Sequence, residues 1–145
     1  MNAYVDASVI LRIAFGEPEP LAAWSEIDQP ISSELIRVEC LRALERARRI
    51  DRLTDVTVAT TRANLLDVLA TMQLIPISGA VLERAAGSFP TTLGTLDAIH
   101  LASALAVQAQ LAPLSLATHD MELALAARSM GFPVQGVALQ ELLES

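Results

Sequence analysis

Two kinds of segment alternate along the chain: short apolar runs, and longer stretches in which hydrophobic residues recur with helical periodicity. The short runs predict strands at 3–5, 30–32, 74–77, 114–117 and 134–137. The longer stretches predict helices at 7–15, 17–28, 33–50, 53–72, 79–86, 95–110 and 119–130. The segments 87–94 and 141–145 are predicted to be a loop and a tail. Ser33 and Thr95 are expected to cap their helices, and Gly16 and Gly131 to end theirs.

Strands separated by helices predict one α/β domain over residues 1–145. The expected architecture has three layers (α/β/α), with a central parallel sheet of about five short strands covered by helices on both faces. No Gly/Ser linker, low-complexity run or internal repeat interrupts this order. In such sheets, ligands bind at the carboxyl ends of the strands, so polar residues there are the first to consider.

The composition indicates a globular protein with an aliphatic core. Of the 145 residues, 52% are hydrophobic and only 3% are aromatic, which argues against a disordered chain. Cys40 is the only cysteine, so no internal disulfide or Cys-rich zinc site is expected, and a reducing cytoplasm is the expected compartment. We expect no membrane span, because Gln108, Gln110 and Pro113 interrupt the most apolar stretch, and no signal peptide.

All ten basic residues are arginines, and the formal net charge is −7. Without lysine, Schiff-base chemistry, P-loop ATP hydrolysis, Ser-Lys catalysis and phosphoreceiver switching are excluded. The acidic balance by itself argues against simple polyanion binding.

Four acidic residues lie next to predicted core. Asp6 and Asp120 each follow a strand and precede a helix, and Asp97 lies in the first turn of a very apolar helix. At 100° per residue, Glu39 falls within about 40° of Ala43, at the edge of the apolar face of its helix. The alternative roles are helix N-caps for Asp6 and Asp120, helix-start electrostatics for Asp97, and a surface ion pair for Glu39.

Taken together, the four acids suggest a metal site, because a parallel sheet can bring them all to one edge. Four neighbouring carboxylates repel one another, and Mg²⁺ or Mn²⁺ would relieve that repulsion. Acid clusters of this type support metal-assisted phosphodiester cleavage. His100 is expected to be a packed or hydrogen-bonded helical histidine, with substrate contact as the alternative. A zinc site from His100, His119 and one acid would match no usual spacing.

Four segments carry a resemblance to a known family. They are YVDASVILRI, SSELIRVECLRALER, LGTLDAIHLASAL and LATHDMELALAARSMGF. In this order and spacing they resemble the PIN domain, specifically the VapC-type toxin ribonucleases of toxin–antitoxin pairs, over nearly the whole chain.

The resemblance implies a PIN-like fold and a Mg²⁺- or Mn²⁺-dependent endoribonuclease that is inhibited by a small cognate antitoxin. It assigns Asp6, Glu39, Asp97 and Asp120 to the catalytic metal site, and it gives supporting roles to the hydroxyls of Ser8 and Thr118. It also implies a homodimer, with residues 7–28 and 53–72 as candidate groove and dimer surfaces. Many members of the family have an arginine near the position of Gly94. This chain lacks that arginine, so the resemblance does not extend to the substrate or antitoxin contact that it makes.

The arginines allow an RNA substrate despite the negative charge. Six of the ten lie between residues 37 and 52, and Arg42 and Arg46 are predicted on the Glu39 side of their helix. Guanidinium groups bind phosphate, so these two are candidate RNA-backbone contacts; a solvated, ion-paired helix face is the alternative. Two other functions remain open: a catalytically silent PIN-like binding module, and another acid-site phosphohydrolase.

Overall fold

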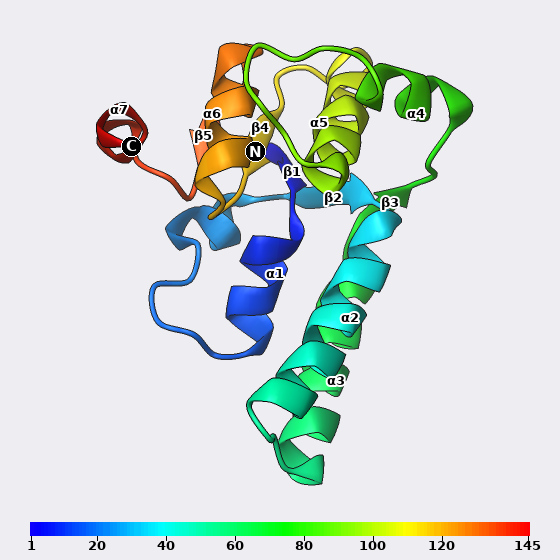
Figure 1. Cartoon of the computed structure of the whole chain (residues 1–145), viewed down its shortest axis with the longest axis vertical. Helices are drawn as coiled ribbons and strands as arrows, with labels where there is room; N and C mark the ends of the chain where they lie inside the picture. The colour runs from blue at the N-terminus through cyan, green and yellow to red at the C-terminus, as the bar shows by residue number, and fades with distance from the viewer.

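Five short strands form one parallel sheet in the middle of the molecule (Figure 1). The computed structural model describes residues 1–145. The strands are β1 (Asn2–Val5), β2 (Gln29–Ser33), β3 (Gln73–Ile75), β4 (Ser115–Ala117) and β5 (Val134–Gln135). Their order is β3-β2-β1-β4-β5, and every neighbouring pair is parallel. The predicted five-stranded parallel sheet is therefore confirmed.

Helices cover both faces of the sheet (Figure 1). One face carries α1 (Ala7–Ala14), α2 (Leu35–Ile50) and α3 (Asp55–Ala70). The other face carries α5 (Thr95–Gln108) and α6 (Met121–Ser129), and α4 (Gly79–Ala85) packs against α5. The chain ends in a short helix, α7 (Leu139–Glu144). The predicted three-layer α/β/α arrangement is thereby confirmed.

The central strand β1 shows why the core divides into two. Its side chains point alternately to the two faces, as in any strand. Ala3 and Val5 lie in the cluster formed with α1, α2 and α3, whereas Tyr4 lies in the cluster formed with α5 and α6. All three residues are fully buried, so β1 is covered on both sides.

The helix predicted over 17–28 is wrong. Only a short 3-10 segment, η1 (Ala22–Glu26), forms there. Glu17 and Glu19 each precede a proline, which disfavours helical backbone at both positions, and Glu19 has a φ of +55°. The tail predicted at 141–145 is also wrong, because those residues belong largely to α7. Glu141 accepts a hydrogen bond from the Ala138 N–H, and Leu142 is buried against α6.

Several predicted helix ends shift by one or two residues. Helix α2 begins at Leu35 rather than Ser33, although the Ser33 hydroxyl still accepts from the Leu35 N–H at 3.1 Å. Gly94, rather than Thr95, is the N-cap of α5. Gly16 (φ +64°) and Gly131 (φ +91°) follow α1 and α6 and adopt left-handed backbone, as predicted for helix ends.

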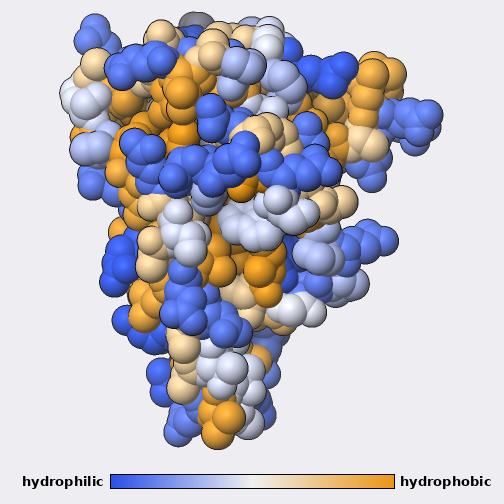
Figure 2. All heavy atoms as spheres, turned by 180° about the vertical axis from the view of Figure 1, so that it is seen from behind, coloured by the Kyte–Doolittle hydropathy of each residue, from blue (hydrophilic) through white to orange (hydrophobic).

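Helices α2 and α3 form a hairpin that projects from the sheet (Figure 1). Figure 2 shows apolar residues reaching the surface at the far end of this hairpin and on the C-terminal projection. The exposed apolar side chains in these regions include Ile50, Val56 and Leu143. No helix is both long and apolar enough to cross a membrane.

Candidate active site

Two of the predicted acidic residues meet where neighbouring strands end. Asp6 directly follows β1, and Asp120 lies three residues after β4. Val5 and Ala117 are register partners in the sheet, and the Asp6 N–H donates to the Ala117 carbonyl at 3.1 Å. The parallel pairing of β1 with β4 therefore brings together residues more than a hundred positions apart.

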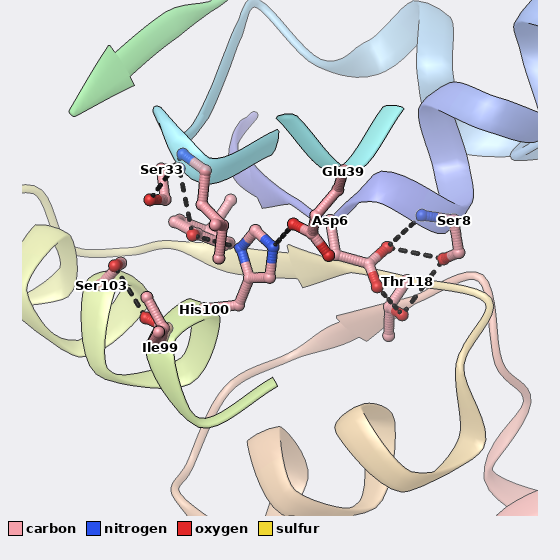
Figure 3. A network of polar contacts seen from close by, with 10 residues as sticks. Asp6, Ser8, Ser33, Glu39, Ile99, His100, Ser103 and Thr118 are labelled. Atoms are coloured by element: carbon pink, nitrogen blue, oxygen red, sulfur yellow. Dashed lines mark hydrogen bonds and ion pairs between the residues drawn. The ribbon is translucent and has the colours of Figure 1, made fainter. Parts of the chain in front are cut away.

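Asp6 is almost completely buried, with 5% exposure, and is held by two hydroxyls. Its Oδ1 accepts from the Ser8 hydroxyl at 2.6 Å and from the Ser8 N–H at 3.2 Å (Figure 3). Its Oδ2 accepts from the Thr118 hydroxyl at 2.9 Å. Burial raises the pKa of Asp6 to about 6, and the charge of Asp120 adds to this, whereas the bonds from Ser8 and Thr118 lower it.

Ser8 and Thr118 also join the starts of α1 and α6. The Ser8 hydroxyl accepts from the His119 N–H, and the Thr118 hydroxyl accepts from the Asp120 N–H, both at 2.9 Å. Each hydroxyl thus donates to Asp6 and accepts from backbone of the β4–α6 junction. This geometry fits the supporting roles predicted for both residues.

Asp97 and Asp120 lie at helix starts and are half-buried. Asp120 is the N-cap of α6, and its Oδ1 accepts from the Leu123 N–H at 2.9 Å. Asp97 lies in the first turn of α5. Burial raises the pKa of Asp97 to about 6, and the charges of Asp120, Asp6 and Glu39 raise it further. The charges of the other three predicted acids thus all contribute to the raised pKa of Asp97.

Glu39 projects from α2, and its side chain is 18% exposed, which agrees with its predicted place at the edge of the apolar face. Its Oε1 bonds to Nε2 of His100. His100 is 1% exposed, and its Nδ1 bonds to the Tyr4 hydroxyl at 2.7 Å (Figure 3). His100 is thus the hydrogen-bonded histidine that the sequence suggested. The part of Tyr4 was missed, although the only tyrosine of the chain, in an apolar strand, needs a partner for its hydroxyl.

The donor set suits a hard divalent cation, because all four candidate ligands offer carboxylate oxygens. The raised pKa values of Asp6 and Asp97 mark carboxyl groups that a nearby cation would help to ionise. With the side chains as they stand, no three Asp, Glu, His or Cys residues are grouped closely enough to hold a metal ion. Asp6, Asp120 and Glu39 are instead engaged by hydroxyl, backbone and imidazole partners.

The two histidines do not combine into a zinc site. Both ring nitrogens of His100 are occupied, by Tyr4 and by Glu39. The Nδ1 of His119 faces the Gly136 carbonyl at 3.3 Å. The structure therefore gives no support to the alternative of zinc bound by His100, His119 and an acid.

A groove of about 800 Å³ lies beside α2 and reaches Glu39. Its lining comprises Ala7, Leu11, Glu39, Arg42, Ala43, Glu45, Arg46, Arg48, Arg49 and Leu96. Arg48 lies 3.9 Å from Glu45 and 3.6 Å from Asp55, whereas Arg42 and Arg46 form no ion pair. The ion-paired face proposed as the alternative thus describes Arg48, whereas the guanidinium groups of Arg42, Arg46 and Arg49 have no ion-pair partner and remain free for an anion.

Comparison with known proteins gives a consistent result. The model of the PIN domain family matches residues 3–128. The chain is 36% identical to Ribonuclease VapC46 of Mycobacterium tuberculosis over 134 residues, which cover 90% of this chain and 94% of that protein. It is 30% identical to Ribonuclease VapC47 of the same species, covering 89% and 92%. The solved structure of PAE2754 from Pyrobaculum aerophilum shares the fold, with a TM-score of 0.61, 21% identity, and coverage of 99% of this chain and 88% of that one.

Proposed function

This chain belongs to the PIN-domain family, and on that basis we propose that it is a Mg²⁺- or Mn²⁺-dependent endoribonuclease, the toxin of a toxin–antitoxin pair. The relatives named as ribonucleases match it over about nine-tenths of its length. The observation that carries the proposal is the meeting of Asp6 with Asp120 at the ends of β1 and β4. The pKa of Asp97, raised by burial and by the charges of Asp120, Asp6 and Glu39, supports it.

In this proposal, Asp6, Glu39, Asp97 and Asp120 hold the cation and form the catalytic site. When bound, Mg²⁺ or Mn²⁺ would supply Lewis acidity, which stabilises charge developing on the phosphate oxygens and favours attack by water. Ser8 and Thr118 hold both oxygens of Asp6 in place, so the carboxylate is fixed before substrate arrives. Such preorganisation reduces the entropy that the reaction must lose.

The groove beside α2 offers the RNA backbone a route to these acids. Arg42 and Arg46 are exposed, lack ion-pair partners and share the groove with Glu39. Their guanidinium groups can bind phosphates in a bidentate fashion, which positions the chain without reading its bases. With aromatic residues at 3%, stacking of bases on the protein contributes little.

The proposal includes a small antitoxin as the protein partner, a homodimer as the assembly, and the cytoplasm as the compartment. The VapC names of the relatives support the first. The exposed apolar side chains Ile50 and Val56 at the end of the α2–α3 hairpin support a further protein contact. The RNAs used in translation, which such a toxin would cut, are present in the cytoplasm.

The direct test is incubation of purified protein with tRNA, rRNA and mRNA in Mg²⁺, with the new ends mapped by sequencing. We expect cleavage that EDTA abolishes and that Asp6→Ala abolishes, while Asp67→Ala, at an exposed position of α3, cleaves as wild type does. Absence of cleavage with intact metal binding would favour a missing cofactor or a different substrate, whereas absence of both cleavage and metal binding would favour a silent binding module. Hydrolysis of small phosphate esters without RNA cleavage would favour another phosphohydrolase.

A further inference from the structure

A buried chain of hydrogen bonds crosses the molecule and ends at Glu39. The Ser33 N–H bonds to the Tyr4 hydroxyl at 3.1 Å, the same hydroxyl bonds to His100 Nδ1 at 2.7 Å, and His100 Nε2 bonds to Glu39 Oε1 (Figure 3). Tyr4 and His100 are 0% and 1% exposed. The chain therefore links β2, β1, α5 and α2 through two side chains that have no access to water.

The direction of each bond follows from the groups at the two ends of the chain. A backbone N–H can only donate, so the Tyr4 oxygen accepts from Ser33. A carboxylate can only accept, so Nε2 of His100 carries the hydrogen that is donated to Glu39. In the neutral imidazole Nδ1 is then an acceptor, and the Tyr4 hydroxyl donates to it. The bond from Tyr4 thus favours the tautomer in which His100 binds a carboxylate.

We propose that Tyr4 and His100 are positioning residues that orient the Glu39 carboxylate for the metal and RNA site, an inference that rests on the proposed function. His100 fixes Oε1 of Glu39, and Oε2 remains without a hydrogen bond on a side chain that reaches the groove with Arg42. A carboxylate fixed through one oxygen presents the other in a defined direction. Loss of a partner that orients a metal ligand in this way typically lowers metal affinity or activity by about 10- to 100-fold.

A purely structural role would not require this arrangement. Tyr4 packs among leucine, isoleucine and alanine side chains, where an apolar residue of similar size would pack without desolvating a polar group. Every bond of the polar chain is made within the protein, and Glu39 is its one member that reaches the groove. The chain therefore places a fixed hydrogen-bond donor on Glu39 at the edge of the groove.

The test compares Tyr4→Phe, His100→Leu and His100→Gln with wild type in Mn²⁺ titrations by calorimetry. We expect His100→Leu to weaken Mn²⁺ binding by about 10- to 100-fold, and Tyr4→Phe to weaken it in the same direction. His100→Gln should recover part of the affinity, because its amide can donate to Glu39. In RNA cleavage, kcat should fall while KM stays near wild type, since the arginines that bind RNA are unchanged.

A second readout is independent of metal. In ¹⁵N NMR of the imidazole, wild-type His100 should show a protonated Nε2 and an unprotonated Nδ1, and Tyr4→Phe should reduce the population of that tautomer. The matched control is Ile31→Val, which removes one methylene from the cluster that contains Tyr4 and should leave both readouts unchanged.

Three outcomes would overturn the inference. The first is folded Tyr4→Phe and His100→Leu proteins that bind Mn²⁺ as tightly as wild type. The second is a wild-type His100 with its proton on Nδ1. The third is a wild-type protein that neither binds Mn²⁺ nor cleaves RNA, which would overturn the proposed function as well. The first two outcomes overturn only the positioning role of Tyr4 and His100, so the failure of that inference is distinguishable from the failure of the proposed function.

Discussion

Thr118 donates a hydrogen bond to Asp6 across the junction of β4 and β1, with 2.9 Å between Oγ1 and Oδ2. The same oxygen of Thr118 accepts from the Asp120 N–H. One hydroxyl thus helps Asp6 to ionise and fixes the backbone that carries Asp120. Removing it should disturb both acids together.

Thr118→Val keeps the shape of the side chain and deletes this hydroxyl. We expect the free energy of unfolding to fall by about 1–3 kcal/mol, because the Asp120 N–H and an oxygen of Asp6 are left without this partner in a buried site. Urea denaturation measures the change. Thr60→Val, at an exposed position of α3, is the control and should change stability by less than about 0.5 kcal/mol. Equal effects of the two substitutions would contradict the role given to Thr118.

Asp6→Asn should change how the stability of the metal-free protein depends on pH. The pKa of Asp6 is about 6 in the folded chain, against an ordinary value of 3.8, so folding favours the protonated form. The stability that this confers is complete below about pH 4 and is lost as pH rises through about 6. The side chain of the asparagine variant does not titrate. Its free energy of unfolding relative to that of wild type should therefore rise by up to about 3 kcal/mol between pH 4 and pH 7.5.

Urea denaturation of both proteins in EDTA from pH 4 to pH 8 measures this difference. Burial, the largest cause of the raised pKa of Asp97, is the same in both proteins, so the titration of Asp97 should largely cancel in the comparison. A difference between the two proteins that does not change with pH would contradict the prediction.

Divalent cations should stabilise wild type and have little effect on Asp97→Asn. A cation at a concentration of about 100 times its dissociation constant adds roughly 2.7 kcal/mol to the free energy of unfolding. For a domain of this size that raises Tm by about 5–10 °C. Thermal melts with and without Mn²⁺ or Mg²⁺ measure the effect, and Asp67→Asn on the exposed side of α3 should respond as wild type does. If Asp97→Asn gains as much as wild type, the four-carboxylate site is wrong.

Replacement of Arg42 and Arg46 by alanine should weaken RNA binding uniformly across sequences. Each lost phosphate contact should reduce the slope of log affinity against log salt by about 1. Filter binding at several salt concentrations, with inactive Asp6→Ala as the background, measures the slope. Arg128→Ala, exposed on α6, should leave it unchanged. The slope is compared for the Asp6→Ala background, for that background with Arg42 and Arg46 replaced, and for that background with Arg128→Ala. If all three slopes are the same, the RNA does not bind in the groove beside α2.

The sequence predicted the sheet and the places of its acids because both depend on local patterns. Apolar runs locate the strands, and Asp6 follows such a run at once. Helical phase alone put Glu39 at the edge of the buried face of α2, where it lies. Which acids meet depends on strand order, which was not predicted from the sequence.

Two features were missed. The backbone of residues 17–28 depends on two prolines, a local signal that outweighs the helical periodicity of that segment. The bond between Tyr4 and His100 joins positions 96 residues apart, which no local pattern can indicate, and either residue alone is typical of ordinary core. Only the packing of α5 against the sheet shows that the histidine bonds to Glu39.

The junction of Asp6 with Thr118 spans 112 positions of the chain. During synthesis Asp6 is made early, and it has neither Thr118 nor Asp120 beside it until about four-fifths of the chain exists. A product truncated before residue 118 therefore lacks both the hydroxyl that holds Asp6 and the acid that follows it.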